Sequence, residues 1–315
     1  MKNLHVIKRT LLKASAGASL LLVNIFSVTE AKAQLYPLGA IYFQNQYLAN
    51  PAMAGIEEGI RMDMAYRKQW STLPGAPQTQ SLTADYGSEK KVGLGLNIYN
   101  DEAGLLKRSR VMATYAYHLP LNQENEKLHF GLSLGIMDER IVNEKIIGSQ
   151  NDATVGRFNQ RKTYLDGDFG IAYTNDRLTL QGSLPNLKTY FNKDQQEGGT
   201  ANRTGFFGAA SYKFFLPNII EGMGFEPKVV YRQIRGNKSL ADIGTNISLA
   251  DNIVNVMAFY HTSESATIGM GVKYKSLMQI SGLYTTGTSA LQGYTNGNFE
   301  LNVKVNLKNK PKVQD

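Results

Sequence analysis

Hydrophobic and polar residues alternate with a period of two along most of the sequence. In residues 92–99, leucine and isoleucine alternate with glycine and asparagine, and residues 128–136 repeat the pattern. Residues 242–249 and 299–306 show it again. Successive side chains of a β-strand point to opposite faces, so each segment is predicted to be a strand with one apolar face and one small or polar face.

Such alternation occurs in soluble β-sandwiches and in membrane β-barrels. The sequence has no long amphipathic helix and no unbroken apolar strand to form a separate core layer. The polar strand positions suit a wet lumen or an exposed sheet face; they are Asp166, Asp168, Lys273, Glu300 and Lys304. We therefore predict an all-β fold, a transmembrane antiparallel β-barrel of about 14 strands, with a secreted sandwich as the alternative.

Each predicted strand is near the length that crosses a bilayer at a tilt, and an even number of strands closes a barrel. The ranges are 59–68, 78–87, 92–99, 108–118, 127–137, 164–173, 177–184, 203–214, 225–234, 240–249, 253–262, 266–275, 276–286 and 297–307.

The predicted connections differ in length between the two ends of the barrel. One end, called the long-loop end, carries residues 69–77, 138–163, 185–202 and 287–296. The other, the short-turn end, carries residues 88–91, 174–176 and 250–252, with a longer apolar turn at 215–224. Outer-membrane barrels have long extracellular loops and short periplasmic turns, so the long-loop end is expected to face the cell exterior.

The first 33 residues have the layout of a secretory signal peptide. Four basic residues precede an apolar run at residues 18–28, which stops at an Ala-Lys-Ala sequence before Gln34. The run is shorter than the roughly 20 residues of a spanning helix. We therefore expect export to the outer membrane and four parts: signal peptide 1–33, N-terminal segment 34–58, barrel 59–307 and polar tail 308–315.

Composition narrows the function classes. No cysteine occurs in the sequence, which excludes a disulfide framework and a lipid-modified N-terminal cysteine. The leader carries five basic residues and one acidic residue, so the net charge falls from +8 for the whole sequence to +4 for residues 34–315. This mild excess forms no basic cluster, and nucleic-acid binding is not indicated.

Residues suited to catalysis or metal binding are few after the leader. His118, His129 and His261 lack metal-ligand spacing to one another or to a carboxylate cluster, and each is interpreted as an ordinary strand residue. Asp166 and Asp168 share one strand face, where they would bind a cation or form a paired acid site. The favoured interpretation is that both are solvated lumen carboxylates.

Glycine-rich positions also have a structural explanation. Gly93 and Gly95 lie inside a predicted strand, so they indicate small lumen residues or a close backbone approach, not a phosphate-binding loop. The sequence has no G-x-S-x-G nucleophile motif. No enzymatic activity and no cofactor are predicted.

One segment before the first strand is unusual. Residues 47–55, YLANPAMAG, are too apolar for an ordinary linker, yet Pro51 and Gly55 are unfavourable in a helix. Its motif residues and those that follow are Asn50, Pro51, Ala52, Gly55, Arg67, Gln69, Trp70, Asp85, Gly93, Gly95, Asn100, Asp101 and Gly104. In their order and spacing the sequence resembles the PorP/SprF family, outer-membrane proteins of the type IX secretion and gliding machinery of Bacteroidota. The polar tail at residues 308–315 departs from the family pattern.

The resemblance implies a barrel that exports a protein with a C-terminal secretion domain, or holds it at the cell surface. The implied partners are such an exported adhesin, type IX secretion subunits and a periplasmic peptidoglycan-binding lipoprotein, with outer-membrane lipid around the barrel. A passive porin or a transporter of small hydrophobic solutes is the alternative.

Two placements remain open. Residues 34–58 are expected on the short-turn side, either as a partial plug in the barrel mouth or ordered against its wall. Trp70, the only tryptophan, is expected either in the interfacial aromatic girdle or packed inward with Arg67 and residues 74–77. The candidate partner contacts are the large apolar side chains of the N-terminal segment and the long loops: Tyr47, Leu48, Phe158, Tyr190 and Phe191.

Overall fold

The computed structural model describes residues 39–70, 75–88, 91–122, 125–142, 163–191, 204–216, 222–234, 238–275, 277–287 and 296–307. The predicted leader, the polar tail, Phe158 and most of the loop at 138–163 lie outside these residues. Among the described residues, no helix is long and apolar enough to cross a membrane.

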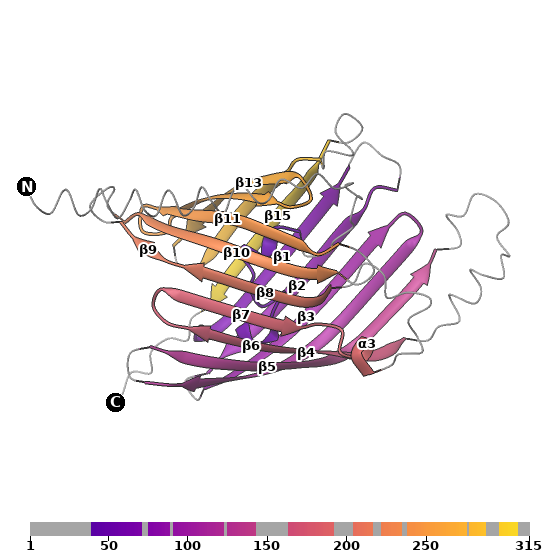
Figure 1. The fold of residues 1–315 in the computed structure, drawn as a ribbon, viewed down its shortest axis with the longest axis horizontal. Helices are drawn as coiled ribbons and strands as arrows, with labels where there is room; N and C mark the ends of the chain where they lie inside the picture. Colours follow the sequence, from indigo (N-terminus) through magenta and orange to yellow (C-terminus); the bar gives the residue numbers. More distant parts are fainter. Residues whose placement is uncertain are drawn as a thin grey trace, which may run out of the picture. The chain divides into compact units, whose positions relative to one another are not determined.

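In the described part of the protein, fifteen strands form a single antiparallel sheet (Figure 1). They are β1 (Gly59–Gln69), β2 (Gln78–Gly87), β3 (Val92–Ala103), β4 (Leu106–Pro120), β5 (Lys127–Ile141), β6 (Tyr164–Thr174), β7 (Leu178–Leu184), β8 (Thr204–Tyr212), β9 (Phe214–Phe215), β10 (Gly224–Ile234), β11 (Leu240–Leu249), β12 (Val254–His261), β13 (Ser265–Tyr274), β14 (Met278–Thr285) and β15 (Asn298–Leu307). The helical turns are η1 (Ile41–Phe43), η2 (Pro51–Met53) and α3 (Lys188–Phe191).

The sheet closes on itself. Neighbouring strands pair in sequence order, β8 pairs with β10, β10 pairs with β11, and the first strand β1 pairs with the last strand β15. Fourteen strands therefore make a closed antiparallel barrel, and β9 is an extra strand that pairs only with β10. The predicted all-β barrel is confirmed.

Burial in the barrel is inverted relative to a soluble sandwich. On β1, Ile60, Met62 and Met64 point outward and are exposed, whereas Asp63 and Arg67 point inward and are buried. A sandwich would bury its apolar face instead. The apolar outer face suits lipid, and this inversion decides between the two predicted folds.

The predicted strand ranges match the structure closely, with two informative differences. β3 continues to Ala103, and the hairpin to β4 is a two-residue turn in which Gly104 has a φ of +59°. The predicted strand 203–214 instead ends at Tyr212. The N–H of Lys213 is bonded to the carbonyl of Arg177, and the next two residues pair with Gly224 and Phe225 as β9.

Candidate functional site: the N-terminal segment in the barrel lumen

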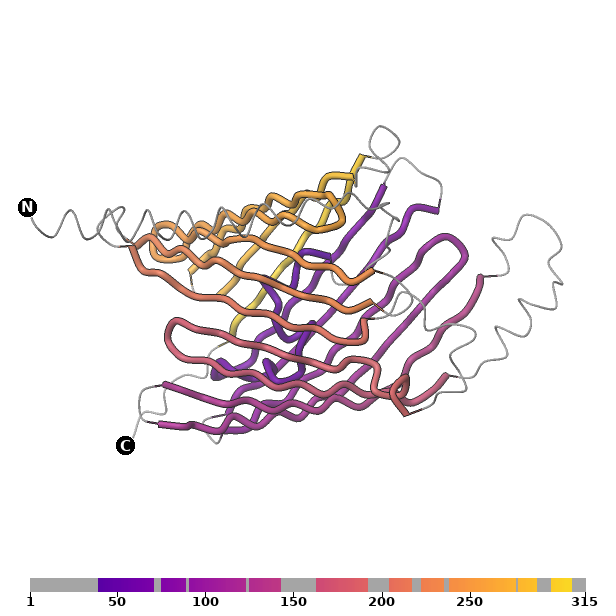
Figure 2. Tube along the Cα trace, viewed as in Figure 1, coloured from indigo at the N-terminus to yellow at the C-terminus, as the bar shows by residue number. Residues whose placement is uncertain are grey.

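The N-terminal segment, residues 39–58, lies inside the ring of strands (Figure 2). Tyr42, Phe43, Tyr47 and Met53 are buried, and η2 contacts the inner faces of β4, β5 and β6. Most of the apolar side chains of the segment are therefore covered by the barrel wall, as the unusual composition of residues 47–55 requires.

The YLANPAMAG sequence explains the local conformation of this segment. Asn50 is fully buried; its side-chain oxygen accepts the N–H of Ala52 at 3.0 Å and caps η2. Pro51 occupies the first position of the turn, where its missing N–H costs nothing. The Asn50 amide donates to the carbonyl of Ile171 at 3.1 Å, and Gly55 leaves the turn with a φ of +68°. The YLANPAMAG sequence therefore forms a turn and also attaches the N-terminal segment to β6.

The segment begins at the long-loop end of the barrel. The N–H of Ala40 donates to both carboxylate oxygens of Glu300, at 3.1 and 3.2 Å. Glu300 is opposite Arg67 near the end of β1, with 3.4 Å between the arginine Nε and the carboxylate. Gly39 has a φ of +52°, and a Cβ there would lie 2.4 Å from Glu300. The prediction that residues 34–58 lie on the short-turn side is wrong for Gly39 and Ala40, because this carboxylate holds them at the opposite end.

A charged group of side chains holds the first turn of the segment. The Tyr42 hydroxyl donates to Asp242 at 3.0 Å, and the same carboxylate pairs with Arg232 and with His261, the latter at 2.7 Å. The Lys228 ammonium lies 4.5 Å from the centre of the Phe43 ring, within the range of a cation–π interaction. Aromatic residues of the segment are thus enclosed by cationic residues of β10.

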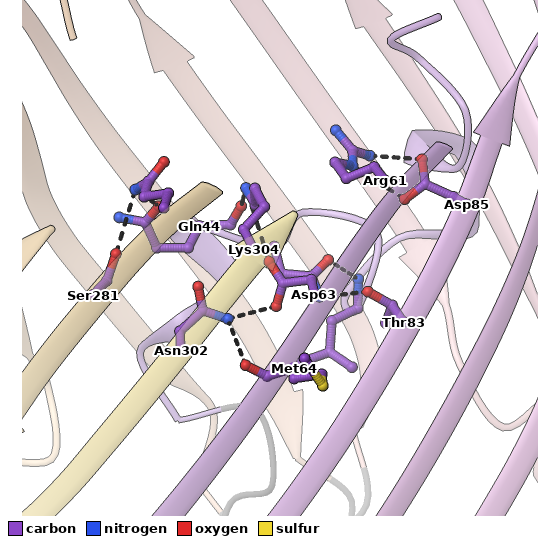
Figure 3. Close-up of polar contacts among 12 residues, drawn as sticks. Gln44, Arg61, Asp63, Met64, Thr83, Asp85, Ser281, Asn302 and Lys304 are labelled. Atoms are coloured by element: carbon purple, nitrogen blue, oxygen red, sulfur yellow. Dashed lines mark hydrogen bonds and ion pairs between the residues drawn. The ribbon is translucent and has the colours of Figure 1, made fainter. Parts of the chain in front are cut away.

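Polar contacts continue down the lumen, as Figure 3 shows. The Asn45 amide donates to Thr83 at 2.8 Å, and Lys304 donates to the carbonyl of Gln44. The Tyr47 hydroxyl is bonded to Thr114 at 2.7 Å.

Glycines line the wall around the second half of the segment. A Cβ on Gly93 would lie 2.1 Å from the Ala54 oxygen, and one on Gly95 would lie 2.4 Å from the Tyr47 hydroxyl. Gly131 and Gly170 meet the Asn50–Ala52 region at similarly short distances. Of the two interpretations, small lumen residues or a close backbone approach, the second holds at Gly93, whereas Gly95 makes room for the Tyr47 side chain. A larger residue at any of the four positions would collide with the segment.

Asp85 fixes the segment where it enters β1. Its carboxylate accepts the N–H of Gly55 at 2.8 Å and two bonds from Arg61, at 3.0 and 2.9 Å (Figure 3). The arginine also reaches the carbonyl of Met53 at 3.4 Å. A buried bidentate ion pair therefore joins β1, β2 and the end of the N-terminal segment.

The remaining motif residues gather at the long-loop end. The N–H groups of Gln69 and Gly104 donate to the carbonyls of Pro77 and Gly75, at 2.9 and 3.1 Å. Asn100 and Asp101 accept hydroxyl bonds from Ser109 at 2.8 Å and Thr79 at 2.7 Å. The structure therefore divides the motif into a lumen group around residues 50–55 and a group that shapes the first two hairpins at this end.

Trp70 belongs to the second group and has an unusual backbone. Its φ is +47°, and its N–H donates to the carbonyl of Gly297 at 2.8 Å. It lines a cavity together with Arg67 and Glu300. Of the two predicted placements, the inward one beside Arg67 agrees with this geometry.

The histidine interpretation needs correction at two positions. His118 and His129 are directly opposite on β4 and β5, and their Nδ1 atoms are 2.7 Å apart. The other nitrogen of His129 is 2.8 Å from the hydroxyl of Thr174. They therefore form a buried pair, brought together by hairpin register and not by sequence spacing. Within the ranges that the structure describes, no group of three or more metal-binding side chains occurs.

Asp166 and Asp168 have a structural task. Asp168 accepts the N–H of Asn186 at 2.8 Å and pairs with Arg110 at 2.5 Å, and Asp166 accepts the N–H of Lys188 at 3.0 Å. Both are buried, which contradicts the solvated-carboxylate interpretation. Pro185 follows the short strand β7. After Pro185 the backbone is held by hydrogen bonds to the two carboxylates and not by pairing with another strand.

Sequence reasoning missed several residues that bind the segment: Thr83, Thr114, Gly131, Gly170, Arg232 and Asp242. All are small or polar residues at inward positions of alternating strands. Their inward position in the alternating pattern was the available signal, but every other lumen residue has the same position.

The candidate partner contacts differ in exposure. Tyr47 is only 2% exposed and contacts the barrel wall, and Leu48 is half-buried. Tyr190 and Phe191, on α3 at the long-loop end, are 38% and 80% exposed. Phe158 lies outside the described residues.

Comparison with known proteins identifies the family. The family described as "Type IX secretion system membrane protein PorP/SprF" matches residues 31–305. This protein belongs to the PorP/SprF family. Membership makes it a membrane component of the type IX secretion system and, with the barrel, supports an outer-membrane location. No curated protein sequence matches it.

Three solved structures that match this PorP/SprF protein have low sequence identity to it. The outer membrane protein Omp33 of Acinetobacter baumannii has 6% identity and a TM-score of 0.47, and the match covers 80% of this protein and 100% of Omp33. The CymD monoaromatic hydrocarbon channel has 9% identity and a TM-score of 0.49, with coverages of 88% and 95%. The KdgM porin has 8% identity and a TM-score of 0.40, with coverages of 78% and 99%.

Proposed function

We propose that this protein is a binding scaffold of the type IX secretion machinery. Its long-loop end holds an exported surface protein that carries a C-terminal secretion domain, such as an adhesin. Its short-turn end faces the periplasm and contacts other secretion subunits, including a peptidoglycan-binding lipoprotein. Export uses a signal peptide that is cleaved before Gln34.

The occupied lumen is the observation that carries this proposal. Residues 40–55 are bonded to inward-facing groups of β2, β4, β6, β11 and β15. Such a segment acts as a plug, because a solute would have to break contacts on several sides of the lumen to pass. A plugged barrel leaves its two ends as the working surfaces, which suits binding better than the alternative, passive transport.

The contact surface at the long-loop end includes Tyr190 and Phe191, because large exposed aromatic side chains are efficient anchors for a partner. By its position in the sequence, Phe158 belongs to another of the predicted loops of the long-loop end. Connections longer than about 12 to 15 residues without secondary structure of their own are usually either functional or disordered.

Replacing residues 143–162 and 192–202 by short Gly-Ser linkers, together with Tyr190→Ser and Phe191→Ser, tests this function. The expected result is an inserted barrel that no longer displays its exported partner at the cell surface, measured by surface labelling of intact cells. Heat-modifiable migration on gels verifies that the barrel is folded. A control carries an insertion in the turn between Leu121 and Glu126 at the short-turn end, and display should persist there.

Conductance distinguishes the scaffold from a porin. The purified wild-type protein in a planar bilayer should show no steady conductance. Normal display by the shortened variant would contradict binding at the long-loop end, and stable open channels in the wild-type protein would contradict the plugged lumen.

A further inference from the structure

The pairing of β6 is incomplete at the long-loop end, on the side of the strand that faces β7. Every residue of β6 is paired with β5, beginning at Tyr164. Pairing with β7 begins only at Phe169, which lies opposite Leu184, the last residue of β7. Residues 164–168 of β6 therefore form a sheet edge that faces a gap in the strand ladder.

The chain that follows β7 covers only part of this edge. The N–H of Leu187 donates to the carbonyl of Gly167 at 2.8 Å, and the N–H of Asn186 donates to the Asp168 carboxylate, also at 2.8 Å. These bonds occupy the edge as far as Gly167. The part nearer the start of β6 remains open.

The opposite side of the gap, at the start of β8, is occupied. The side-chain amide of Asn186 donates to the carbonyl of Thr204 at 3.2 Å, and the Tyr190 hydroxyl donates to the carbonyl of Gly205. The two edges of the gap therefore differ, and the open one belongs to β6.

Leu165 presents two backbone groups at this open edge. Alternate residues of an antiparallel strand bond to the same neighbour, and the N–H of Asn175 bonds to the carbonyl of Leu178 across the β6–β7 turn. The odd-numbered residues of β6 therefore face β7. The N–H and C=O of Leu165 point into the gap, and neither has a hydrogen-bond partner among the residues that the structure describes.

The surroundings of the open edge are apolar. The side chain of Leu165 is 76% exposed on the outer face, directly opposite Ile136 of β5, which is 48% exposed. Backbone groups beside such a surface need a partner, because little water is available there to replace one. The helical turn α3, which carries the exposed Phe191, contacts β6 beside this edge (Figure 1).

We propose that the edge of β6 at Leu165 binds an extended segment of the exported protein by strand addition. An extended polypeptide supplies the N–H and the C=O that the two groups of Leu165 require, at the spacing of a strand. Phe191 contacts the same partner from α3. This inference rests on the proposed function, because the added strand belongs to the exported protein held at the long-loop end.

Photo-crosslinking in intact cells identifies the protein that covers this edge. The photo-reactive residue p-benzoylphenylalanine replaces Leu165, and we expect a covalent product with the exported protein, recognised by its C-terminal secretion domain. Leu180 is the matched control position, because it is 42% exposed on β7 in a stretch that is paired on both sides. No product with the exported protein is expected there.

A proline substitution tests the pairing itself. The N–H of Leu165 faces the gap, so Leu165→Pro removes a bond to the added strand but none to β5. Surface display of the exported protein should fall at least about tenfold, the loss expected for one hydrogen bond and a blocked edge. Leu165→Ala keeps the N–H and should stay within about twofold of wild type.

The folding of the variants is checked by heat-modifiable migration on gels. If the proline variant does not fold, Leu165→Lys replaces it in the display test, since a charged residue on a sheet edge opposes strand addition. The crosslinking experiment depends on neither substitution.

Three results would overturn strand addition: a crosslink from position 165 to a second copy of this protein, no crosslink from that position to any protein, and normal display by a folded Leu165→Pro variant. Comparison with the loop replacement separates this inference from the proposed function. If the loop replacement abolishes display and Leu165→Pro does not, only strand addition is wrong. If both variants display the partner normally, the proposed function is wrong as well.

Discussion

The two sides of the lumen hold the N-terminal segment in different ways. The glycine wall, formed by Gly93, Gly95, Gly131 and Gly170 on β3, β5 and β6, lets the backbone around Asn50–Ala54 come into direct contact with the strands. The charged wall, formed by Lys228, Arg232, Asp242 and Glu300 on β10, β11 and β15, reaches residues 40–43 through long side chains.

The difference shows that close packing and charge pairing are separate requirements for holding the segment in one barrel. On the glycine wall, specificity comes from missing side chains, so almost any larger residue is excluded. On the charged wall it comes from paired groups, so removing one partner leaves another charge buried without compensation. The second half of the segment is therefore fixed by shape, and the first half by electrostatics.

The largest effect is expected on the charged wall. Asp242→Ala removes the carboxylate that Tyr42, Arg232 and His261 share and should lower the free energy of unfolding by about 3 kcal/mol. Urea unfolding in detergent, followed by tryptophan fluorescence, measures the loss. Glu58→Ala changes an exposed acidic residue and should be nearly neutral. Equal stabilities of the two variants would show that the charged wall does not hold the segment.

A smaller effect is expected on the glycine wall. Gly131→Ala places a Cβ 2.2 Å from the Pro51 backbone and should cost about 2 kcal/mol of stability. Gly282→Ala is the matched control, because a Cβ there has no neighbour within 4 Å. The same unfolding measurement applies to both variants. If Gly131→Ala were as stable as the control, the close approach at the glycine wall would be refuted.

The smallest effect concerns a single hydrogen bond in the middle of the segment. Tyr47→Phe removes the hydroxyl bonded to Thr114 and should lower the free energy of unfolding, measured in the same way, by about 1 kcal/mol. Tyr66→Phe removes an exposed hydroxyl that lies 3.3 Å from Gln78, and its cost should be near zero. If Tyr66→Phe were more destabilising than Tyr47→Phe, shape alone would hold the segment around Tyr47.

The strand pattern was predictable because it depends on neighbours in the sequence. A period of two fixes which side chains share a face, so the fold and the outward direction of Leu94 and Leu132 follow from the sequence. The separate strand β9 was not predictable, because a two-residue strand has too few residues to show a period.

The arrangement inside the barrel was much less accessible to prediction. The contact between Ala40 and Glu300 joins residues 260 positions apart, and no local pattern reports it. The pairing of His118 with His129 requires the register of the β4–β5 hairpin, which alternation alone leaves open by two residues in either direction. Gly93 and Gly95 were interpretable because glycine in a strand already indicates a close approach.

The closing contact between β1 and β15 has a consequence for how the protein is made. Residues 39–58 precede β1, yet they lie within a ring that is complete only when the last strand has paired with the first. During synthesis the segment exists before any wall can surround it, and Glu300 is among the last residues to reach it. The contact between Ala40 and Glu300 joins residues 260 positions apart, so it is a long-range contact that forms late and slowly. The last strand therefore completes two structures at once, the wall of the barrel and the carboxylate contact that holds the start of the N-terminal segment.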